Sequence, residues 1–123
     1  MKKKTFLITG GTGFIGSNIC ELLIKKKYKV KIFDNNSRGS LNNIKKIKKQ
    51  VKFIKGDIRN RQSLIRASKN TDVVIHLAYI NGTKYFYSNP VLILDVAVKG
   101  IINVIEACIK NKVTELYLAS SSE

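Results

Sequence analysis

Five short apolar runs alternate along this chain with segments of helical periodicity, and that alternation limits the possible folds more than any other feature. The runs are residues 5–9, 29–34, 51–55, 72–78 and 115–120. Runs of this length that are apolar on both faces are typical of buried parallel strands. Parallel strands need crossover connections, which are right-handed and mostly helical. We therefore predict an α/β fold with a doubly wound parallel sheet and strand order 3-2-1-4-5.

The segments between the runs predict four helices. The first has an apolar stripe over residues 15–23, the second covers 41–49 and the third 61–69. The fourth begins at Ser88 or Asn89, each a good N-cap residue, with Pro90 in its first turn, and extends to about residue 111. It is apolar almost all round. We expect one face to cover the sheet and the other to meet a further helix or a partner subunit.

The first run leads into a glycine-rich turn, TGGTGFIGS, at residues 9–17. Glycines at this spacing permit a tight turn, let the backbone approach a pyrophosphate, and open a helix whose N–H groups bind phosphate. No Lys follows Gly16, which argues against a P-loop. The second run ends in Asp34, where a carboxylate accepts hydrogen bonds from a ribose and repels a 2′-phosphate. This pattern predicts a Rossmann-type domain that prefers NAD over NADP, although Arg38 lies nearby.

The other runs also end in polar or small residues. Asp57 follows the third run, where it either caps the next helix or lies near an adenine. Ala78, at the end of the fourth run, allows close approach of a cofactor. The one histidine, His76, is expected to lie in the core, with no partners for a metal site. The fifth run ends in three serines that we expect at the same edge of the sheet.

The net charge of +15 suggests nucleic-acid binding as an alternative. However, 19 of the 23 basic residues are Lys, and they are dispersed. Nucleic-acid recognition favours Arg, so a solubilising surface is the preferred interpretation. Cys20 and Cys108 form no ligand or redox motif and are expected to be buried free thiols, which fits a reducing cytoplasm. No apolar window is long enough to suggest a membrane span.

Five segments together resemble a known family. TGGTGFIGS, DNNSRGS, GDIRN, VIHLA and ASSSE occur in the order and spacing of the extended short-chain dehydrogenase/reductase family, and are most similar to its NAD-dependent nucleotide-sugar epimerase/dehydratase branch. The resemblance covers the whole chain. It implies NAD as cofactor, a nucleotide-sugar substrate, and a homodimer for the full-length protein.

The resemblance also implies roles for individual residues. The pyrophosphate would be bound by the glycine turn, the adenosine ribose by the segment after the second run, the adenine by the pair after the third, and the cofactor backbone would pass the end of the fourth. The residues implied are, in that order, Gly10, Gly13, Phe14, Ile15 and Gly16; Asp34, Asn35 and Ser37; Asp57 and Ile58; and Leu77 and Ala78.

In that family the catalytic Ser/Thr corresponds to Ser121, and Glu123 is the position of a base in the dehydratases. The family's chemistry also needs a Tyr-x-x-x-Lys pair. Tyr85 and Tyr117 are followed four residues later by Asn89 and Ser121, so this pair is expected beyond residue 123. Residues 1–123 would then be an incomplete NAD-binding Rossmann domain, inactive alone, that stops before the sixth strand and the substrate domain.

Two positions depart from the family pattern: Tyr79 replaces a small residue, and Ala97 replaces an Asn that often binds the cofactor. The leading hypothesis is the NAD-binding portion of a nucleotide-sugar epimerase. The alternatives are a 4,6-dehydratase of the same branch, suggested by Ser121 to Glu123, a non-catalytic dinucleotide-binding module, and, on charge alone, an RNA-binding protein.

Overall fold

Five parallel strands form the centre of the structure, a computed structural model that describes residues 3–37, 39–80 and 82–120. They lie in the order β3-β2-β1-β4-β5, as the sequence predicted. The fourth and fifth strands are shorter than expected, although single backbone bonds from Leu77 and Ala119 continue the ladder beyond their ends. The strands are β1 (Thr5–Thr9), β2 (Lys29–Asp34), β3 (Val51–Lys55), β4 (Val73–His76) and β5 (Glu115–Leu118).

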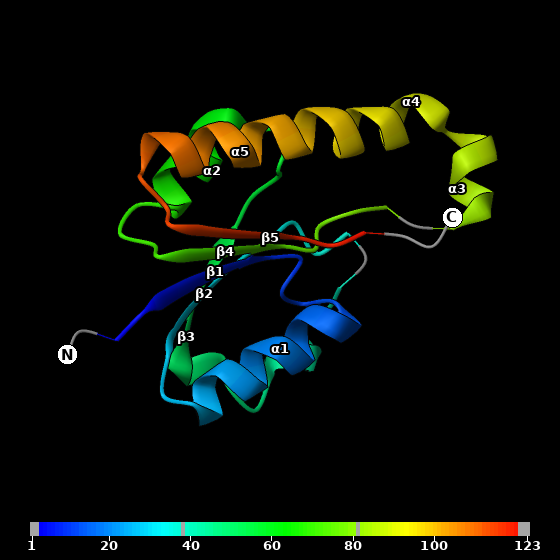
Figure 1. Cartoon of the computed structure of the whole chain (residues 1–123). Coiled ribbons are helices and arrows are strands. Elements are labelled where there is room, and N and C mark those ends of the chain that lie inside the picture. The colour runs from blue at the N-terminus through cyan, green and yellow to red at the C-terminus, as the bar shows by residue number, and fades with distance from the viewer. Residues whose placement is uncertain (1–2, 38, 81, 121–123) are drawn as a thin grey trace.

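Helices cover both faces of the sheet (Figure 1). One face packs on α1 (Phe14–Lys25), with Ile8, Cys20 and Ile32 fully buried between them. The other face packs on α2 (Arg61–Ala67) and on the long helical segment before β5. There Leu7, Phe33 and other apolar side chains form a second buried cluster. The two clusters account for the doubly wound arrangement, because alternate residues of each strand point into opposite layers.

The predicted helix over 41–49 is instead two short 3-10 helices, η1 (Leu41–Ile44) and η2 (Lys48–Gln50). The side chain of Ser40 caps the first of them by accepting a hydrogen bond from the Asn42 N–H. Ile44 and Ile47 are buried against α1 and β2, while Leu41 is partly exposed. Two of the three apolar residues therefore pack against the sheet layer, but in tighter helices than the sequence suggested.

The fourth predicted helix consists of several connected pieces. A short helix that the sequence analysis did not predict, α3 (Thr83–Ser88), precedes it. The long segment then comprises α4 (Pro90–Leu94), a π-helical turn η3 (Asp95–Lys99) and α5 (Gly100–Lys110). Asn89 is its N-cap, accepting a hydrogen bond from the Leu92 N–H, and Pro90 occupies the first turn as predicted.

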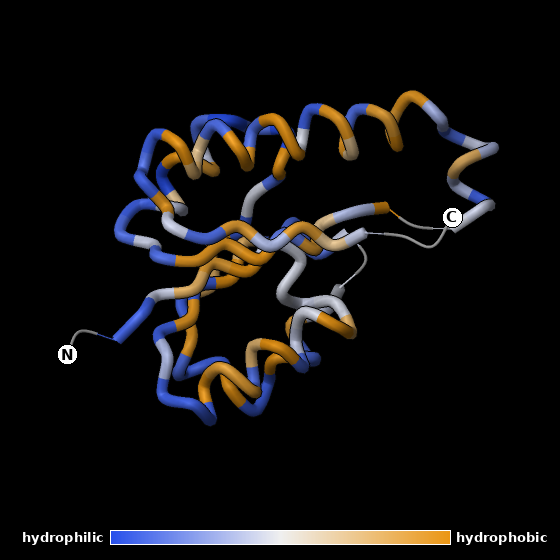
Figure 2. The backbone as a smooth tube through the Cα atoms, viewed as in Figure 1, coloured by the Kyte–Doolittle hydropathy of each residue, from blue (hydrophilic) through white to orange (hydrophobic). Residues whose placement is uncertain are grey.

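One face of this long segment carries apolar side chains that nothing in the described chain covers. Figure 2 shows the alternation of apolar and polar residues along the long helical segment. The inner side chains Val96, Val104 and Ala107 are buried. The apolar residues that are exposed on the same segment are Val91, Leu94, Val98, Ile102, Ile105 and Ile109. The expectation that a second apolar face remains after the sheet is covered is thus confirmed.

Within residues 3–37, 39–80 and 82–120, none of the helices has the length and apolar character needed to cross a membrane.

Candidate functional site

A cleft lies at the carboxyl ends of the strands, where segments after β1, β2, β3 and β4 meet. In an open parallel sheet this is the edge at which ligands bind. The cleft is closed on one side by Leu92 and Val96 of the long helical segment. Its other lining residues are Gly10, Gly13, Phe33, Asp34, Asn35, Ser37, Gly39, Gly56, Asp57, Ile58, Arg59, Leu77, Ala78, Tyr79 and Ile80.

The glycine turn brings the amino end of α1 to this cleft. Gly10 has a φ of +74°, a left-handed conformation that glycine adopts without strain. At Gly16 a Cβ atom would overlap the carbonyl oxygen of Gly10, so only glycine permits this close approach. The N-cap of α1 is Gly13, and its first turn has no acidic residue. The first N–H groups of the helix therefore lack helical acceptors and can bind an anion.

Asp34 connects the end of β2 to the glycine turn. Its Oδ2 accepts hydrogen bonds from the backbone N–H of Thr12 at 3.0 Å and from the Thr12 hydroxyl at 2.6 Å. Its Oδ1 accepts one from the Asn36 N–H at 2.7 Å. Asp34 is 8% exposed, and what remains exposed faces the cleft. Because a carboxylate has about four acceptor positions, Oδ1 keeps one for a ligand hydroxyl.

The segment after Asp34 turns back along the cleft. Asn35 accepts a hydrogen bond from the Ser37 N–H at 2.9 Å, which holds both residues at the rim. Asn36 has a φ of +60°, which Asn tolerates better than most residues. The turn thus places Asn35 and Ser37 in the cleft wall together with Asp34. Arg38 lies outside the described residues.

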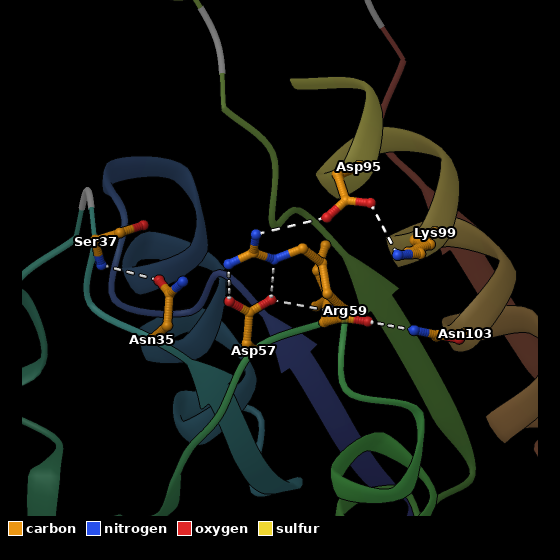
Figure 3. Close-up of polar contacts among 8 residues, drawn as sticks. Asn35, Ser37, Asp57, Arg59, Asp95, Lys99 and Asn103 are labelled. Atoms are coloured by element: carbon orange, nitrogen blue, oxygen red, sulfur yellow. Dashed lines mark hydrogen bonds and ion pairs between the residues drawn. The ribbon is translucent and has the colours of Figure 1, made fainter. Parts of the chain in front are cut away.

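Asp57 does not cap the helix that follows it. The N-cap of α2 is Asn60, whose side chain accepts a hydrogen bond from the Ser63 N–H. Asp57 is held instead by the backbone and guanidinium of Arg59, and Figure 3 shows the two side chains facing each other. Arg59 keeps the pKa of the Asp57 carboxyl below its usual value, and Asn35 lowers this pKa further. The carboxylate therefore stays an anionic acceptor at the cleft.

The end of β4 supplies the apolar part of the site. His76 is fully buried, and burial lowers its pKa to about 4, so the ring is neutral at pH 7. Its Nδ1 lies 2.6 Å from the hydroxyl of Thr9, and its Nε2 has no hydrogen-bond partner in the described part of the chain. The Thr9 hydroxyl also accepts from the N–H groups of Leu77 and Ala78. His76 thus lies in the core, as expected, and its contact with Thr9 helps to position this strand end.

Tyr79 follows in the cleft wall, with its ring centroid 5.0 Å from that of His76. Burial raises the pKa of its phenol above the usual value. A large aromatic side chain therefore occupies this end of the cleft, where the family pattern has a small residue.

Most of the residues proposed from the sequence come together. Nine of them line the cleft: Gly10, Gly13, Asp34, Asn35, Ser37, Asp57, Ile58, Leu77 and Ala78. Phe14, Ile15 and Gly16 lie in the adjoining first turn of α1, and the Phe14 and Ile15 side chains are exposed. Ser120 is exposed and does not line the cleft, while Ser121 and Glu123 lie outside the described residues.

Sequence reasoning missed Thr12 and Arg59. Thr12 stands inside the glycine turn, but its bond to Asp34 spans 22 positions and has no local signal. Arg59 could have been noticed, because a basic residue two positions after an acid can fold back on it. Among the described residues no group of three or more His, Cys, Asp or Glu could hold a metal ion.

Comparison with known proteins agrees with this geometry. The sequence profile of the family described as GDP-mannose 4,6 dehydratase matches residues 7–123. The chain belongs to this family. Membership confirms the resemblance to the NAD-dependent nucleotide-sugar epimerases and dehydratases and the Rossmann-type fold.

The relatives of this family member include epimerases. The UDP-glucose 4-epimerase of Neisseria meningitidis serogroup C is 34% identical over 125 residues, which cover 97% of this chain and 37% of that protein. The epimerase Mth375 of Methanothermobacter thermautotrophicus has a similar structure, with a TM-score of 0.92, 34% identity, and coverage of 98% and 36% of the two chains.

A third relative was solved with a ligand. The UDP-glucose 4-epimerase of Thermus thermophilus, in complex with NAD, has a TM-score of 0.84 and 34% identity, and covers 91% of this chain and 36% of that one. The family member described here thus spans little more than a third of the length of these relatives.

Proposed function

We propose that this chain binds NAD in the cleft at the carboxyl ends of β1 to β4. The observation that carries the proposal is the convergence of an uncapped helix end and two carboxylates on one cleft. The first turn of α1 would bind the pyrophosphate through its free N–H groups. Asp34, with Asn35 and Ser37, would bind the adenosine ribose through its remaining acceptor position. The Thermus thermophilus relative supports this, because it was solved with NAD.

The adenine and nicotinamide ends have different surroundings. Asp57 and Ile58 border one end of the cleft, and we assign the adenine to them. Leu77 and Ala78 follow β4 and precede Tyr79 in the cleft wall, and we assign the rest of the cofactor to that side. Ala97 replaces an Asn of the family pattern, so we expect one cofactor hydrogen bond fewer here.

NAD is preferred over NADP in this proposal. The Asp34 carboxylate is fixed by three hydrogen bonds to Thr12 and Asn36 and cannot readily move away from a 2′-phosphate. Placing a phosphate dianion beside it would cost electrostatic energy.

For the whole protein we propose a nucleotide-sugar epimerase, supported by the epimerase relatives. Bound NAD would supply the acceptor for a hydride from the carbon that carries the sugar hydroxyl, and the hydride would later return to that carbon. Ser121 would bind the reacting sugar oxygen, and a Tyr-x-x-x-Lys pair outside residues 1–123 would remove its proton. The second candidate is a 4,6-dehydratase with Glu123 as base, favoured by the description of the matching family. Residues 1–123 would be the NAD-binding domain and inactive alone.

We also propose that the full-length protein is a homodimer. The exposed apolar residues of the long helical segment occur at spacings of three and four, such as Val91, Leu94, Val98 and Ile102. This is the pattern of a helix that packs on another helix. A cytoplasmic location is proposed because both cysteines are free and buried. Nucleic-acid binding is not part of the proposal, because charge alone suggests it.

Calorimetric titration tests the proposal. We expect NAD to bind tightly enough to measure, and NADP to bind at least tenfold more weakly, because a carboxylate beside the 2′-phosphate costs about 1.4 kcal/mol or more. Equal or tighter binding of NADP would contradict the assignment of Asp34. Assay of the full-length protein with a nucleotide sugar then separates the candidates: an epimer supports the first, and a 4-keto-6-deoxy sugar the second.

A further inference from the structure

The Arg59 guanidinium donates hydrogen bonds to both oxygens of the Asp57 carboxylate. Its Nε donates to Oδ1 at 3.0 Å and a terminal nitrogen donates to Oδ2 at 2.7 Å, while its backbone N–H donates to Oδ1 at 2.9 Å (Figure 3). Two-pronged guanidinium–carboxylate pairs fix the plane of the carboxylate as well as its position. Of about four acceptor positions on the carboxylate, Arg59 fills three, so at most one, on Oδ2, is left for the Asn35 side chain and a ligand.

The same guanidinium reaches the long helical segment. Its third nitrogen lies 3.7 Å from Oδ2 of Asp95, and the other oxygen of Asp95 lies 3.1 Å from the Lys99 ammonium. Figure 3 shows Arg59 standing between Asp57 and Asp95. Asp95 opens the π-helical turn, in which backbone bonds join residues five apart instead of four. That wider turn places Asp95, five residues before Gly100, on the side of the segment that faces the loop after β3.

Two contacts of Ile58 complete the attachment of this loop. The Asn103 side chain donates to the Ile58 carbonyl oxygen at 2.9 Å in a buried position. The Ile58 side chain packs so closely on Gly100 that a Cβ atom there would overlap Ile58 Cδ1. Asp95, Gly100 and Asn103 thus hold consecutive parts of the loop against one side of the helical segment. The position of Asp57 at the cleft depends on this attachment.

The ion pairs of Arg59 contribute little to folding. The Arg59, Asp57 and Asp95 side chains are each about one-third exposed, at 36%, 30% and 34%. Pairs this exposed stabilise a protein by roughly 0–1 kcal/mol. Their main effect is on geometry, because they decide which lone pair of Asp57 faces the cleft.

We propose that Arg59 is a positioning residue for adenine recognition: it orients Asp57, and Asp95 anchors Arg59 to the helical segment. The inference rests on the proposed function, which places the adenine beside Asp57 and Ile58. The acceptor position that Arg59 leaves on Asp57 suits an exocyclic amino group. A purine with a carbonyl oxygen at the same place would set two acceptors against each other. Arg59 therefore determines the preference for an aminopurine over an oxopurine dinucleotide.

The test compares binding of NAD with binding of its hypoxanthine analogue, in which the adenine amino group is replaced by oxygen. Both are titrated calorimetrically into the unmodified chain and into Arg59→Gln, Arg59→Lys and Asp95→Asn. Arg61→Gln is the matched control: it removes the same charge two positions later, and Arg61 also pairs with the long helical segment, at Glu106, but does not line the cleft. Thermal unfolding of each variant verifies that it is folded.

We expect the unmodified chain to prefer NAD by about tenfold or more, the effect of one hydrogen bond to a charged group. In Arg59→Gln this ratio should fall to about one or two, mainly through weaker NAD binding. Arg59→Lys should retain only part of the preference, because the lysine ammonium keeps the charge but cannot form the two-pronged pair. Asp95→Asn should lower it by about threefold, and Arg61→Gln should leave it unchanged.

Three results would overturn the inference, and each has a distinct meaning. An unchanged ratio in Arg59→Gln would mean that Asp57 is positioned without Arg59. An equal loss of ratio in Arg61→Gln would mean that charge, and not the two-pronged pair, is responsible. If the unmodified chain binds neither dinucleotide, the proposed function itself fails. If Arg59→Gln unfolds, the binding ratio in Arg59→Lys decides instead. A ratio equal to that of the unmodified chain would then count against the proposal.

Discussion

Thr12 donates both its hydroxyl and its backbone N–H to one oxygen of Asp34, at 2.6 and 3.0 Å. Thr12 is fully buried and Asp34 nearly so, and the two residues belong to neighbouring segments that end at the same edge of the sheet. The carboxylate that faces the cleft is therefore also the support of the glycine turn. Changes at either residue should affect stability and ligand binding together.

Thr12→Val should lower the free energy of unfolding by about 1–3 kcal/mol, because a buried carboxylate oxygen loses one of its two donors. Affinity for NAD should fall in parallel, since Asp34 is then less firmly oriented. Thr12→Ser keeps the hydroxyl and is the matched control. Urea denaturation and calorimetric titration measure the two effects. Similar losses in both variants would show that the hydroxyl is not responsible.

Gly16→Ala should destabilise the protein by about 1–3 kcal/mol, because its Cβ would overlap the Gly10 carbonyl oxygen and force the turn open. Gly13→Ala is a graded comparison, since its Cβ would lie 3.3 Å from the same oxygen and needs only a small adjustment. Urea denaturation of both variants checks the difference. If the two variants are equally stable, close packing at Gly16 is not what requires glycine there.

His76 should make stability depend on pH. Its pKa is about 4 in the folded chain and near 6.5 when exposed, so between these values the unfolded chain binds a proton that the folded chain does not. Stability should therefore fall as the pH is lowered through this window, with a slope of up to about 1.4 kcal/mol per pH unit from this residue. Above pH 7 the effect disappears.

Denaturation series at several pH values measure that slope. His76→Gln removes the titrating group, and the slope between pH 4 and 6.5 should become smaller, whatever the variant's absolute stability. Asp57 has a lowered pKa and loses its stabilising contribution only in more acidic solution, so it does not mimic this effect. An identical slope in the variant would mean that another group titrates.

Ile102→Lys should reduce self-association. Ile102 is 48% exposed in the middle of the apolar face of the long helical segment, and a charge there opposes burial against a second copy. Leu22→Lys is the control, because Leu22 is similarly exposed, at 53%, but lies on α1 across the sheet. Analytical ultracentrifugation of the three proteins at equal concentration measures the effect. Equal association of both variants would place the contact elsewhere.

The sheet was predictable because its signal is local: each strand is a short apolar run bounded by polar residues. The segment over 41–49 shows where such reasoning fails. Its apolar residues Leu41, Ile44 and Ile47 recur every three positions, which matches the 3-10 helix better than the 3.6-residue period of an α-helix. With Asn42 and Asn43 in the first turn, the sequence also has little helix propensity there.

The location of the cleft was predictable because polar residues occur at the carboxyl ends of the predicted strands. Asp34 is the last residue of β2 and Asp57 comes two positions after the end of β3, so they had to lie at one edge of a parallel sheet. The contacts that orient them were not predictable. The Asn103 bond to Ile58 spans 45 positions, and the π-helical turn that presents Asp95 leaves no mark in an apolar helix. Such contacts depend on the assembled fold, not on local propensity.

NAD binding at the carboxyl ends of the strands is tested most directly by an NMR titration of the isotopically labelled chain with NAD. Backbone amide signals should shift for residues 10–16, 34–37, 56–59 and 77–79 while those at the opposite end of the sheet stay in place. That end carries a lysine-rich depression that includes Lys3, Lys29 and Lys52. A dinucleotide attracted by positive charge alone would bind in this depression instead of the cleft. Shifts confined to that depression, or no shifts at all, would mean that NAD does not bind in the cleft.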